Sequence, residues 1–269
     1  MSSPAGRRTD LGRALCVITG ASRGFGRALA VEVSGLLKPG SALVVAARSA
    51  EDLRTLQADL AESEAGRAGL MVQRVAADLG EQQGVDSVVR ACKEAFSEDI
   101  DHVILVNNAG SLGDVSRYIP SFTDMAEVNS YMSLNVISPL CLTASILQAF
   151  PQRPGLRRTV VNISSLCAVQ PFPSWVLYCT GKAGRDMTFR VLAEEDPDLR
   201  VLNYAPGPLD TAMMRDAIST AADPTIKKTY GDMHAKGEIL TCEASCTKLI
   251  KLLLEDTYKS GAHVDFYDI

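Results

Sequence analysis

The sequence predicts a doubly wound α/β fold, in which seven parallel strands form one sheet with helices on both faces. Short apolar runs alternate with helical stretches along almost the whole chain. Most of the runs lack polar alternation, which is typical of strands buried on both faces. No change in composition separates two domains, and 269 residues are ordinary for a single domain of this class.

Seven short apolar runs are the expected strands: Ala14–Thr19, Ala42–Ala47, Leu70–Ala76, His102–Asn107, Thr159–Ser164, Leu199–Tyr204 and Ala262–Phe266. The clearest expected helices lie between the first four of them, at Gly26–Leu37, Glu51–Ser63 and Gln82–Phe96. In the second helix, leucines recur at positions 53, 56 and 60, which places them on one face.

Two segments stand outside this alternation. Residues 1–12 are small and polar, so we expect a short flexible tail before a domain that covers residues 13–269. Residues 210–238 are polar, lack a strand pattern and are interrupted by Pro224. We expect them to cross the carboxyl edge of the sheet as a substrate loop or lid, because ligands bind at that edge in such folds.

Composition excludes several classes of function. The net charge of −5 argues against a nucleic-acid partner or an anionic membrane surface. No apolar run approaches the length of about 18 residues that a membrane span needs. The seven cysteines show no metal-ligand spacing, so free thiols and no metal are expected. Free thiols without a secretion signal predict a reducing compartment, the cytoplasm.

A glycine-rich loop follows the first strand and opens the first helix. It contains Gly20, Ser22, Arg23, Gly24, Phe25 and Gly26. Glycines allow a tight turn and a close approach to a pyrophosphate, and the helix N-terminus offers free N–H groups to it. The loop therefore predicts a dinucleotide-binding site, although a plain turn between strand and helix has a similar pattern.

The second strand indicates which dinucleotide binds. Readers of NAD place a carboxylate near the end of this strand, whereas Arg48 and Ser49 stand here. A guanidinium suits a 2′-phosphate, and Arg23 offers a second one. We therefore expect NADP(H). Asp78 and Leu79 follow the third strand, where Asp78 either accepts a hydrogen bond from the adenine amino group or caps a helix.

Three polar side chains form the expected catalytic core. Tyr178 and Lys182 are one helical turn apart, so they share a helix face. We expect the lysine ammonium to lower the pKa of the phenol, which then donates a proton to a substrate oxygen. Ser165 follows the fifth strand and can hold that oxygen. Asn108 follows the fourth strand, at the same edge of the sheet.

Together, the glycine loop, the turn at residues 107–110, Ser165 and the Tyr178–Lys182 pair resemble the short-chain dehydrogenase/reductase family. The resemblance implies a Rossmann-type fold, Asn135 as a fourth catalytic residue and a contact of Lys182 with the nicotinamide ribose. It also implies a homodimer through helices within residues 122–149 and 178–195. The residues implied around the cofactor and substrate are Leu209, Asp210, Thr211, Met213, Leu166 and Gly207. Gly181 departs from the usual serine.

Runs at residues 111–116, 162–168, 204–211 and 259–268 resemble the members of this family that reduce side-chain ketones of pterins. This resemblance implies reduction of a tetrahydropterin ketone toward tetrahydrobiopterin, with the pterin ring held by Asp265. A carboxylate can accept two parallel hydrogen bonds from such a ring. Without the resemblance, Asp265 is a solvated residue near the C-terminus. Trp175 and Phe172 fit an aromatic wall or ordinary core packing equally well.

Two other functions share most of these motifs. A broad-specificity carbonyl reductase of the same family has the same catalytic residues. A non-catalytic protein that senses NADP(H) needs the loop but has no use for Ser165, Tyr178 and Lys182 together. The sequence favours an enzyme over the sensor for that reason.

Overall fold

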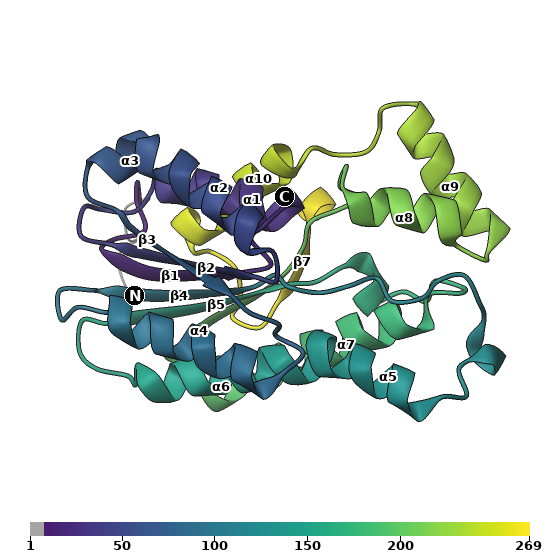
Figure 1. The fold of residues 1–269 in the computed structure, drawn as a ribbon, viewed down its shortest axis with the longest axis horizontal. Helices are drawn as coiled ribbons and strands as arrows, with labels where there is room; N and C mark the ends of the chain where they lie inside the picture. The colour runs from purple at the N-terminus through teal and green to yellow at the C-terminus, as the bar shows by residue number, and fades with distance from the viewer. Residues whose placement is uncertain (1–7) are drawn as a thin grey trace.

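One parallel sheet forms the centre of the molecule. The computed structural model describes residues 8–269 and contains the strands β1 (Ala14–Thr19), β2 (Ala42–Ala47), β3 (Met71–Ala76), β4 (His102–Asn107), β5 (Arg157–Ile163), β6 (Arg200–Ala205) and β7 (His263–Asp265). Their order is β3-β2-β1-β4-β5-β6-β7, and every pair is parallel. The predicted seven-stranded, doubly wound fold is confirmed (Figure 1).

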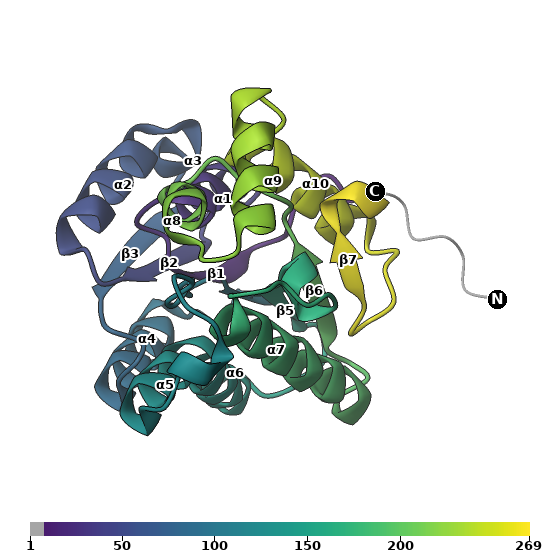
Figure 2. The ribbon, with the colours of Figure 1, turned by 90° about the vertical axis from the view of Figure 1, so that its right-hand side faces the viewer.

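Helices cover both faces of the sheet. One face carries α1 (Gly24–Ser34), α2 (Ala50–Glu62), α3 (Glu64–Arg67) and α10 (Cys242–Glu255), and the other carries α4 (Gln82–Ala95), α6 (Ser138–Ala149) and α7 (Val176–Glu195) (Figures 1 and 2). The shorter elements are η1 (Ile119–Ser121), α5 (Met125–Met132), the π-helical η2 (Ser133–Ile137), η3 (Leu166–Ala168), α8 (Ala212–Thr220), α9 (Pro224–Ala235) and η4 (Phe266–Asp268).

The sheet separates two apolar cores, because successive side chains of a strand point to opposite faces. In β1, Cys16 and Ile18 join the core below α1, α2 and α10, whereas Leu15 and Val17 join the core below α4, α6 and α7. All four of these side chains are fully buried. The central strands are therefore apolar on both faces, as the sequence predicted.

The edge strand β3 differs from that prediction. It begins at Met71, whose side chain is exposed, and four of its other positions are only partly buried or exposed. The physical reason is position: among residues 8–269, β3 has one neighbouring strand, β2, and so forms an edge of the sheet. The remaining boundaries agree with the prediction to within a few residues, the largest differences being at α1, which spans Gly24–Ser34 rather than Gly26–Leu37.

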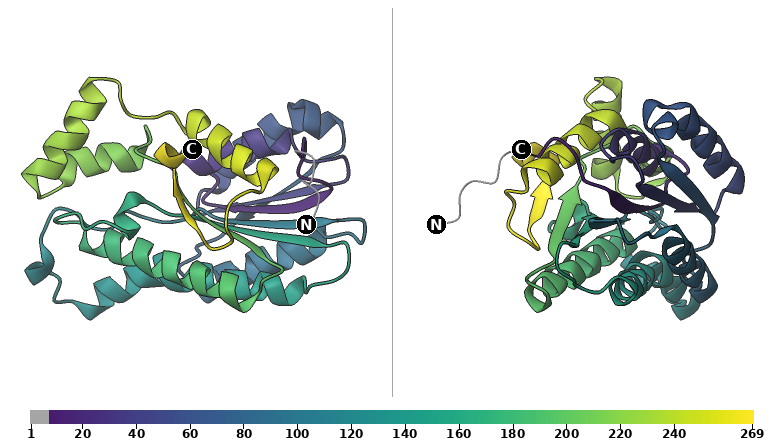
Figure 3. Two further views of the ribbon diagram at one scale, coloured as in Figure 1. Left: turned by 180° about the vertical axis from the view of Figure 1, so that it is seen from behind. Right: turned by 90° about the vertical axis from the view of Figure 1, so that its left-hand side faces the viewer.

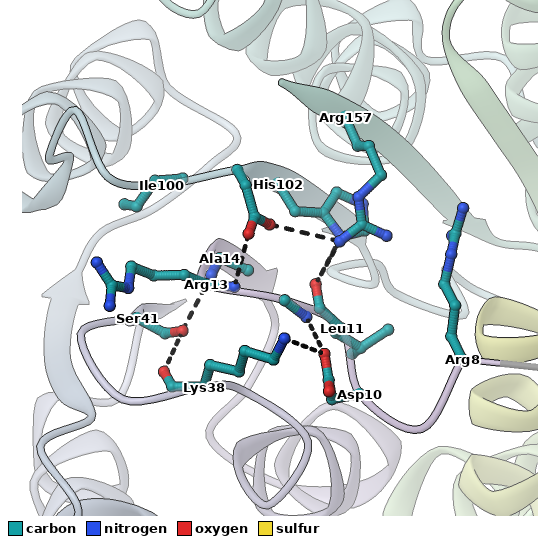
Figure 4. Close-up of polar contacts among 12 residues, drawn as sticks. Arg8, Asp10, Leu11, Arg13, Ala14, Lys38, Ser41, Ile100, His102 and Arg157 are labelled. Atoms are coloured by element: carbon teal, nitrogen blue, oxygen red, sulfur yellow. Dashed lines mark hydrogen bonds and ion pairs between the residues drawn. The ribbon is translucent and has the colours of Figure 1, made fainter. Parts of the chain in front are cut away.

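The start of the domain also differs from the prediction. Of the expected tail, residues 1–7 lie outside the described residues, but the segment from residue 8 packs against the sheet (Figure 4). Leu11 is buried, and its N–H donates to the carbonyl of Leu36 at 2.9 Å. Its own carbonyl accepts from Arg157 and faces His102. Burial of an apolar side chain thus brings Leu11 and Gly12 into the domain.

Residues 210–238 form the helices α8 and α9, which project beyond the sheet (Figures 1 and 3). Thr211 caps α8 and Asp223 caps α9 through side-chain hydrogen bonds to backbone N–H groups. Pro224 separates the two helices and occupies the first position of α9, where its missing N–H costs nothing. A bridge between Leu209 and Leu240 closes the base of the excursion.

The helical stretch Met125–Ala149, made of α5, η2 and α6, is long and apolar enough to cross a membrane by length and composition alone. This finding differs from the expectation that no apolar run is long enough to cross a membrane. Core helices of globular proteins pass the same test, and only 33% of the apolar window is buried within the chain. Its exposed apolar side chains include Met125, Ile137 and Leu140.

Candidate active site

The glycine loop packs tightly between β1 and α1. Gly20 and Gly24 have φ angles of +67° and +56°, which L side chains rarely adopt. A Cβ on Gly26 would lie 2.4 Å from the carbonyl oxygen of Gly20 and from Nδ2 of Asn108. Arg23 stands at the N-cap without a capping side-chain hydrogen bond. The loop and the open first turn of α1 therefore fit a dinucleotide pyrophosphate.

Two arginines flank this loop. The side chains of Arg23 and Arg48 are both exposed, and neither forms a hydrogen bond or ion pair with another residue of the described range 8–269. By contrast, the nearby Arg27 is held by Asp59 at 2.6 Å. Ser49 caps α2 by accepting from the N–H of Asp52. Arg23 and Arg48 are thus free to meet an anionic ligand.

Asp78 and Leu79 follow β3, next to the same edge. Asp78 is exposed and accepts from the N–H of Gly80 at 2.9 Å, while the N-cap position of α4 is Glu81. The alternative that Asp78 caps this helix is therefore wrong. The Leu79 side chain is buried in the core below α4, so a ligand can meet this residue only through its backbone.

Asn108, which directly follows β4, holds the glycine loop in place through hydrogen bonds. Its Nδ2 donates to the carbonyls of Thr19 at 2.8 Å and Gly20 at 3.1 Å. The Thr19 hydroxyl in turn accepts from the N–H groups of Asn108 and Ala109, both at 3.0 Å. The side chain of Asn108 therefore positions the loop from beneath, and its amide is already engaged by protein atoms.

The three predicted catalytic side chains meet at this edge. Tyr178 lies in the first turn of α7, and Nζ of Lys182 lies 5.5 Å from the centre of its ring. Ser165 follows β5, accepts from the N–H of Cys167 at 3.2 Å and lies within hydrogen-bonding reach of the Tyr178 phenol. Nζ of Lys182 donates to the carbonyl of Ile163 at 2.6 Å. A substrate oxygen between Ser165 and Tyr178 would meet two hydroxyl groups.

The electrostatics of this trio differ from the expectation. Burial raises the pKa of Tyr178 well above its usual value, Cys167 adds to the rise, and the hydrogen bond from Ser165 opposes it. Burial also lowers the pKa of Lys182 to about 7, helped by the nearby Arg185 cation. The expected lowering of the phenol pKa by the lysine is wrong for this arrangement, because desolvation dominates and Lys182 is directed at Ile163.

Asn135 lies in the π-helical turn η2 between α5 and α6, and it is buried. Its Nδ2 donates to the carbonyl of Tyr131 at 2.8 Å and to the hydroxyl of Ser111 at 3.1 Å, while its Oδ1 accepts from the N–H of Ser111 at 2.8 Å. Single π-turns recur at functional sites. The asparagine thus joins this helix to the loop that follows β4.

Gly181 is explained by its neighbour. A Cβ at this position would lie 3.1 Å from Cε1 and from the hydroxyl oxygen of Tyr131. The Tyr131 hydroxyl donates to the carbonyl of Ser111 at 3.3 Å, so the ring is held in place. Close packing of α7 on α5 therefore favours glycine where the family pattern has serine.

Aromatic rings extend the site away from Tyr178. Trp175 meets Tyr178 edge-on at 5.7 Å and stacks on Tyr230 at 5.7 Å, and Phe172 lies 5.7 Å from Trp175. Trp175 is buried and packs against Tyr178, so it is part of the apolar core and also borders the candidate site. The sequence does not indicate that Tyr230 belongs to the site, because this residue lies in α9, far along the chain from Tyr178. The one hint is that an aromatic residue occurs within the predicted lid.

Asp265 is the last residue of β7. Its Oδ1 accepts from the N–H of Tyr267 at 3.0 Å, and Asp268 completes a capping box around η4. Tyr267 is exposed and close enough to raise the pKa of Tyr230, after burial and two cysteines. Asp265 is half-buried, so it has a structural role in the chain end and keeps part of its carboxylate open.

Most of the remaining predicted residues lie in the loop between β6 and α8, whereas Met213 lies in α8 and Leu166 in η3. Gly207 has a φ of +76°, Leu209 is buried, and Asp210 forms an exposed ion pair with Arg215. Thr211 caps α8. A Cβ added at Gly24 would lie 3.3 Å from Cγ2 of Thr211, so this loop packs against the glycine loop. The exposed apolar residues here are Met213 and Leu166.

Comparison with known proteins agrees with this geometry. A family model described as short chain dehydrogenase matches residues 14–222, from β1 to the loop between α8 and α9. The chain belongs to the short-chain dehydrogenase family. It is therefore an oxidoreductase that acts on a carbonyl or alcohol group with a nicotinamide cofactor, and the predicted family resemblance is confirmed.

Two curated relatives match over almost their whole length. Sepiapterin reductase of Bos taurus is 52% identical over 269 residues, which are 100% of both chains. Sepiapterin reductase of Rattus norvegicus is 53% identical over 260 residues, 96% of this chain and 98% of the relative. The crystal structure of L-sorbose reductase from Gluconobacter frateurii, complexed with NADPH and L-sorbose, is 25% identical with a TM-score of 0.74 and covers 96% of each chain.

Proposed function

We propose that the protein uses NADPH to reduce the side-chain ketone of a pterin such as sepiapterin or 6-pyruvoyl-tetrahydropterin, the latter on the way to tetrahydrobiopterin. The observation that carries this proposal is the arrangement of Ser165, Tyr178 and Lys182 beside a row of aromatic rings that begins at Trp175 and Tyr230. The 52% identity to a sepiapterin reductase over the full chain supports the choice of substrate.

In this proposal the side chains divide the chemistry. A dinucleotide held by the glycine loop and the open first turn of α1 would supply the hydride that the ketone carbon needs. Ser165 and Tyr178 donate hydrogen bonds to the ketone oxygen, and the phenol of Tyr178 gives up its proton as the alcohol forms. The raised pKa of Tyr178 keeps the phenol protonated, so that its proton is available when the ketone oxygen gains charge. Lys182, whose Nζ lies 5.5 Å from the centre of the Tyr178 ring, returns a proton to the tyrosine. Asn135 holds the loop after β4 and, as the family resemblance implies, relays that proton through water together with Lys182.

The preference for NADPH rests on Arg23 and Arg48. Two exposed cations without protein partners beside the glycine loop suit a ribose 2′-phosphate, and no carboxylate ends β2. Arg48→Asp should raise KM for NADPH about 10- to 100-fold while leaving KM for NADH nearly unchanged, as expected for a lost charge-assisted hydrogen bond. Arg90→Asp on the exposed face of α4 is the matched control. Equal changes for both cofactors would refute the assignment.

The pterin ring is placed against the aromatic wall with its amino end toward Asp265. A carboxylate that accepts two N–H bonds fixes the far end of the ring and thereby the ketone at Tyr178. Asp265→Ala should raise KM for sepiapterin at least tenfold without weakening NADPH binding. Asp265→Asn, which keeps one acceptor for the Tyr267 N–H, separates substrate binding from the structural role of the residue.

Assembly and location complete the proposal. Ile137 and Leu140, with Met187 and Val191 of α7, expose apolar side chains on neighbouring helices. We place the contact of a homodimer on this face, since burying such a surface is favourable. The seven cysteines are free thiols, which suits the cytoplasm.

A substrate panel tests the whole proposal. The enzyme with NADPH should turn over sepiapterin with a far higher kcat/KM than a simple aliphatic diketone, and Tyr178→Phe should lose at least 100-fold in kcat. Comparable turnover of both substrates would favour a broad carbonyl reductase. An unchanged activity of Tyr178→Phe would mean that the tyrosine is not the proton donor.

A further inference from the structure

Four polar side chains stand in register across the sheet. Strand pairing aligns Asn107 of β4 with Asn162 of β5, Asn162 with Asn203 of β6, and Asn203 with His263 of β7. Aligned residues of neighbouring parallel strands point to the same face. Here that is the face under α6 and α7, because Asn107 donates to Thr143 of α6 at 2.9 Å. We call these four residues the polar row.

Helix α7 inserts a carboxylate into this row. Asp186 is 5% exposed, and its Oδ1 accepts from Nδ2 of Asn162 at 3.1 Å and from the hydroxyl of Ser164 at 2.5 Å. Its Oδ2 accepts from Nδ1 of His263 at 2.5 Å. Asp186 therefore connects α7 with strands β5 and β7 at once. The row itself is joined by a hydrogen bond from Asn162 to Asn203 at 2.9 Å.

Both ends of this connection lead to the active site. Asp186 lies one turn after Lys182 on the same face of α7, and Ser164 directly precedes Ser165. On the other side, His263 and Asp265 are two residues apart in β7 and so share a face of the strand. Asp186 and His263 themselves have no place in the proposed chemistry, because their side chains point into the interior between helix and sheet.

The hydrogen bond between Asp186 and His263 matters for the position of the short strand β7. It has three residues, pairs only with β6 and lies at the end of the sheet beside α7 (Figure 2). A buried carboxylate with three directed hydrogen bonds defines one orientation of its partners, whereas an apolar contact would allow sliding. Nε2 of His263 is buried without a partner among the described residues, so the ring is oriented through Nδ1.

We propose that Asp186 and His263 are a positioning pair, whose hydrogen bond holds β7 and its Asp265 at a fixed distance from Ser165, Tyr178 and Lys182. This inference rests on the proposed function, in which Asp265 holds the pterin ring. The pair touches neither substrate nor cofactor. It sets the span between the residue that anchors the substrate and the residues that react with its ketone, and so it affects long substrates and not short ones.

Three carboxylates lie around His263. Asp186 faces it from α7, Asp265 lies on its own strand, and Asp268 belongs to η4; the hydrogen bond to Asp186 is the largest cause that raises the pKa of His263. The imidazolium therefore persists to higher pH than usual. As pH rises through this raised pKa, the ion pair loses its charge, and the affinity for the pterin should fall.

Three variants of the full-length enzyme test the pair. His263→Ala removes the donor, His263→Asn places an amide nitrogen near the position of Nδ1, and His263→Gln places it near the position of Nε2. KM and kcat are measured for sepiapterin and for 2,3-butanedione, a diketone without a ring for Asp265 to hold. NADPH binding and thermal unfolding are measured in parallel as checks of the fold.

We expect His263→Ala and His263→Gln to raise KM for sepiapterin about tenfold, which corresponds to about 1.4 kcal/mol. KM for butanedione should change less than about twofold, and His263→Asn should restore most of the sepiapterin affinity. The rise of KM with pH in the parent enzyme should be absent in His263→Asn, which cannot titrate.

Two results would overturn the positioning pair. One is an unchanged KM for sepiapterin in His263→Ala, and the other is an equal loss for both substrates that follows the loss of thermal stability. A different result addresses the proposed function itself: a parent enzyme that turns over butanedione but not sepiapterin would remove the pterin assignment, and the role of the pair would be rejected with it.

Discussion

Arg185 is the most informative position for a test of the buried network, because this buried cation donates hydrogen bonds to three groups at the ends of β4 and β5. The side chain is 1% exposed. Its Nε donates to Oδ1 of Asn162 at 2.8 Å, and its terminal nitrogens donate to the carbonyl of Ala109 at 2.9 Å and to the carbonyl of Asn107. Arg185→Met keeps the length and apolar stem of the side chain and removes all three donors.

The expected loss follows from these contacts. Each of the three buried acceptors left without a donor costs about 1–3 kcal/mol, and removal of the buried cation offsets part of this cost because its desolvation is relieved. We therefore expect the free energy of unfolding to fall by about 4 kcal/mol. For a chain of this size, each kcal/mol lowers Tm by about 2–4 °C, so Tm should fall by about 10 °C.

Urea unfolding followed by far-UV circular dichroism measures this change. Arg190→Met is the matched control, because Arg190 lies on the same helix and is exposed. The control should change the free energy of unfolding by no more than about 0.5 kcal/mol. A loss below about 1 kcal/mol in Arg185→Met would refute the view that these hydrogen bonds hold the strand ends.

A kinetic readout follows from the same substitution. The Arg185 cation contributes to the low pKa of Lys182, second to burial. Removing the cation favours the ammonium form of Lys182, so its pKa should rise above the present value of about 7. The pH profile of kcat/KM should shift toward higher pH, whereas a shift in the other direction would contradict this coupling.

Three further predictions concern other parts of the molecule. A hydrogen bond with the Cys167 thiol lowers the pKa of the half-buried Cys179 to about 7. Iodoacetamide should therefore label Cys179 first, and faster as pH rises through about 7. Mass spectrometry that finds another cysteine labelled first would contradict this. Burial lowers the pKa of His102 from 6.5 to about 4, so the chain should lose up to about 3 kcal/mol of stability as pH falls between these values, since only the unfolded state takes up the proton; urea unfolding of His102→Gln should show a flatter pH dependence. Leu140→Glu with Met187→Glu should convert the proposed dimer to a monomer in size-exclusion chromatography, and an unchanged elution volume would place the interface elsewhere.

Local pattern was enough to predict the order of elements. β1, β2 and β4 begin and end at the predicted residues, because the rows of apolar side chains in a central parallel strand reflect burial on both faces. Edge positions were harder: β3 contains Gln73 and Arg74 among apolar residues, and the sheet order shows why these polar side chains are tolerated, because β3 is an edge strand.

The active-site residues divide in the same way. Tyr178 and Lys182 are neighbours through helical spacing, and Ser165 follows a strand that ends at the same edge, so short-range geometry placed all three. Tyr230 reaches Tyr178 only through the fold of α8 and α9, and no spacing in the sequence indicates that contact.

By itself, the sequence determined the fold class, the glycine loop and the proximity of Ser165, Tyr178 and Lys182, because each depends on residues that are close along the chain or on strands with a shared direction. The tertiary structure alone decided the direction of the pKa shift of Tyr178, since burial outweighs its charged neighbour. It alone also brought Asp186 to His263, which are 77 residues apart. Desolvation and long-range hydrogen bonds arise only when distant segments pack together, and no local pattern encodes them.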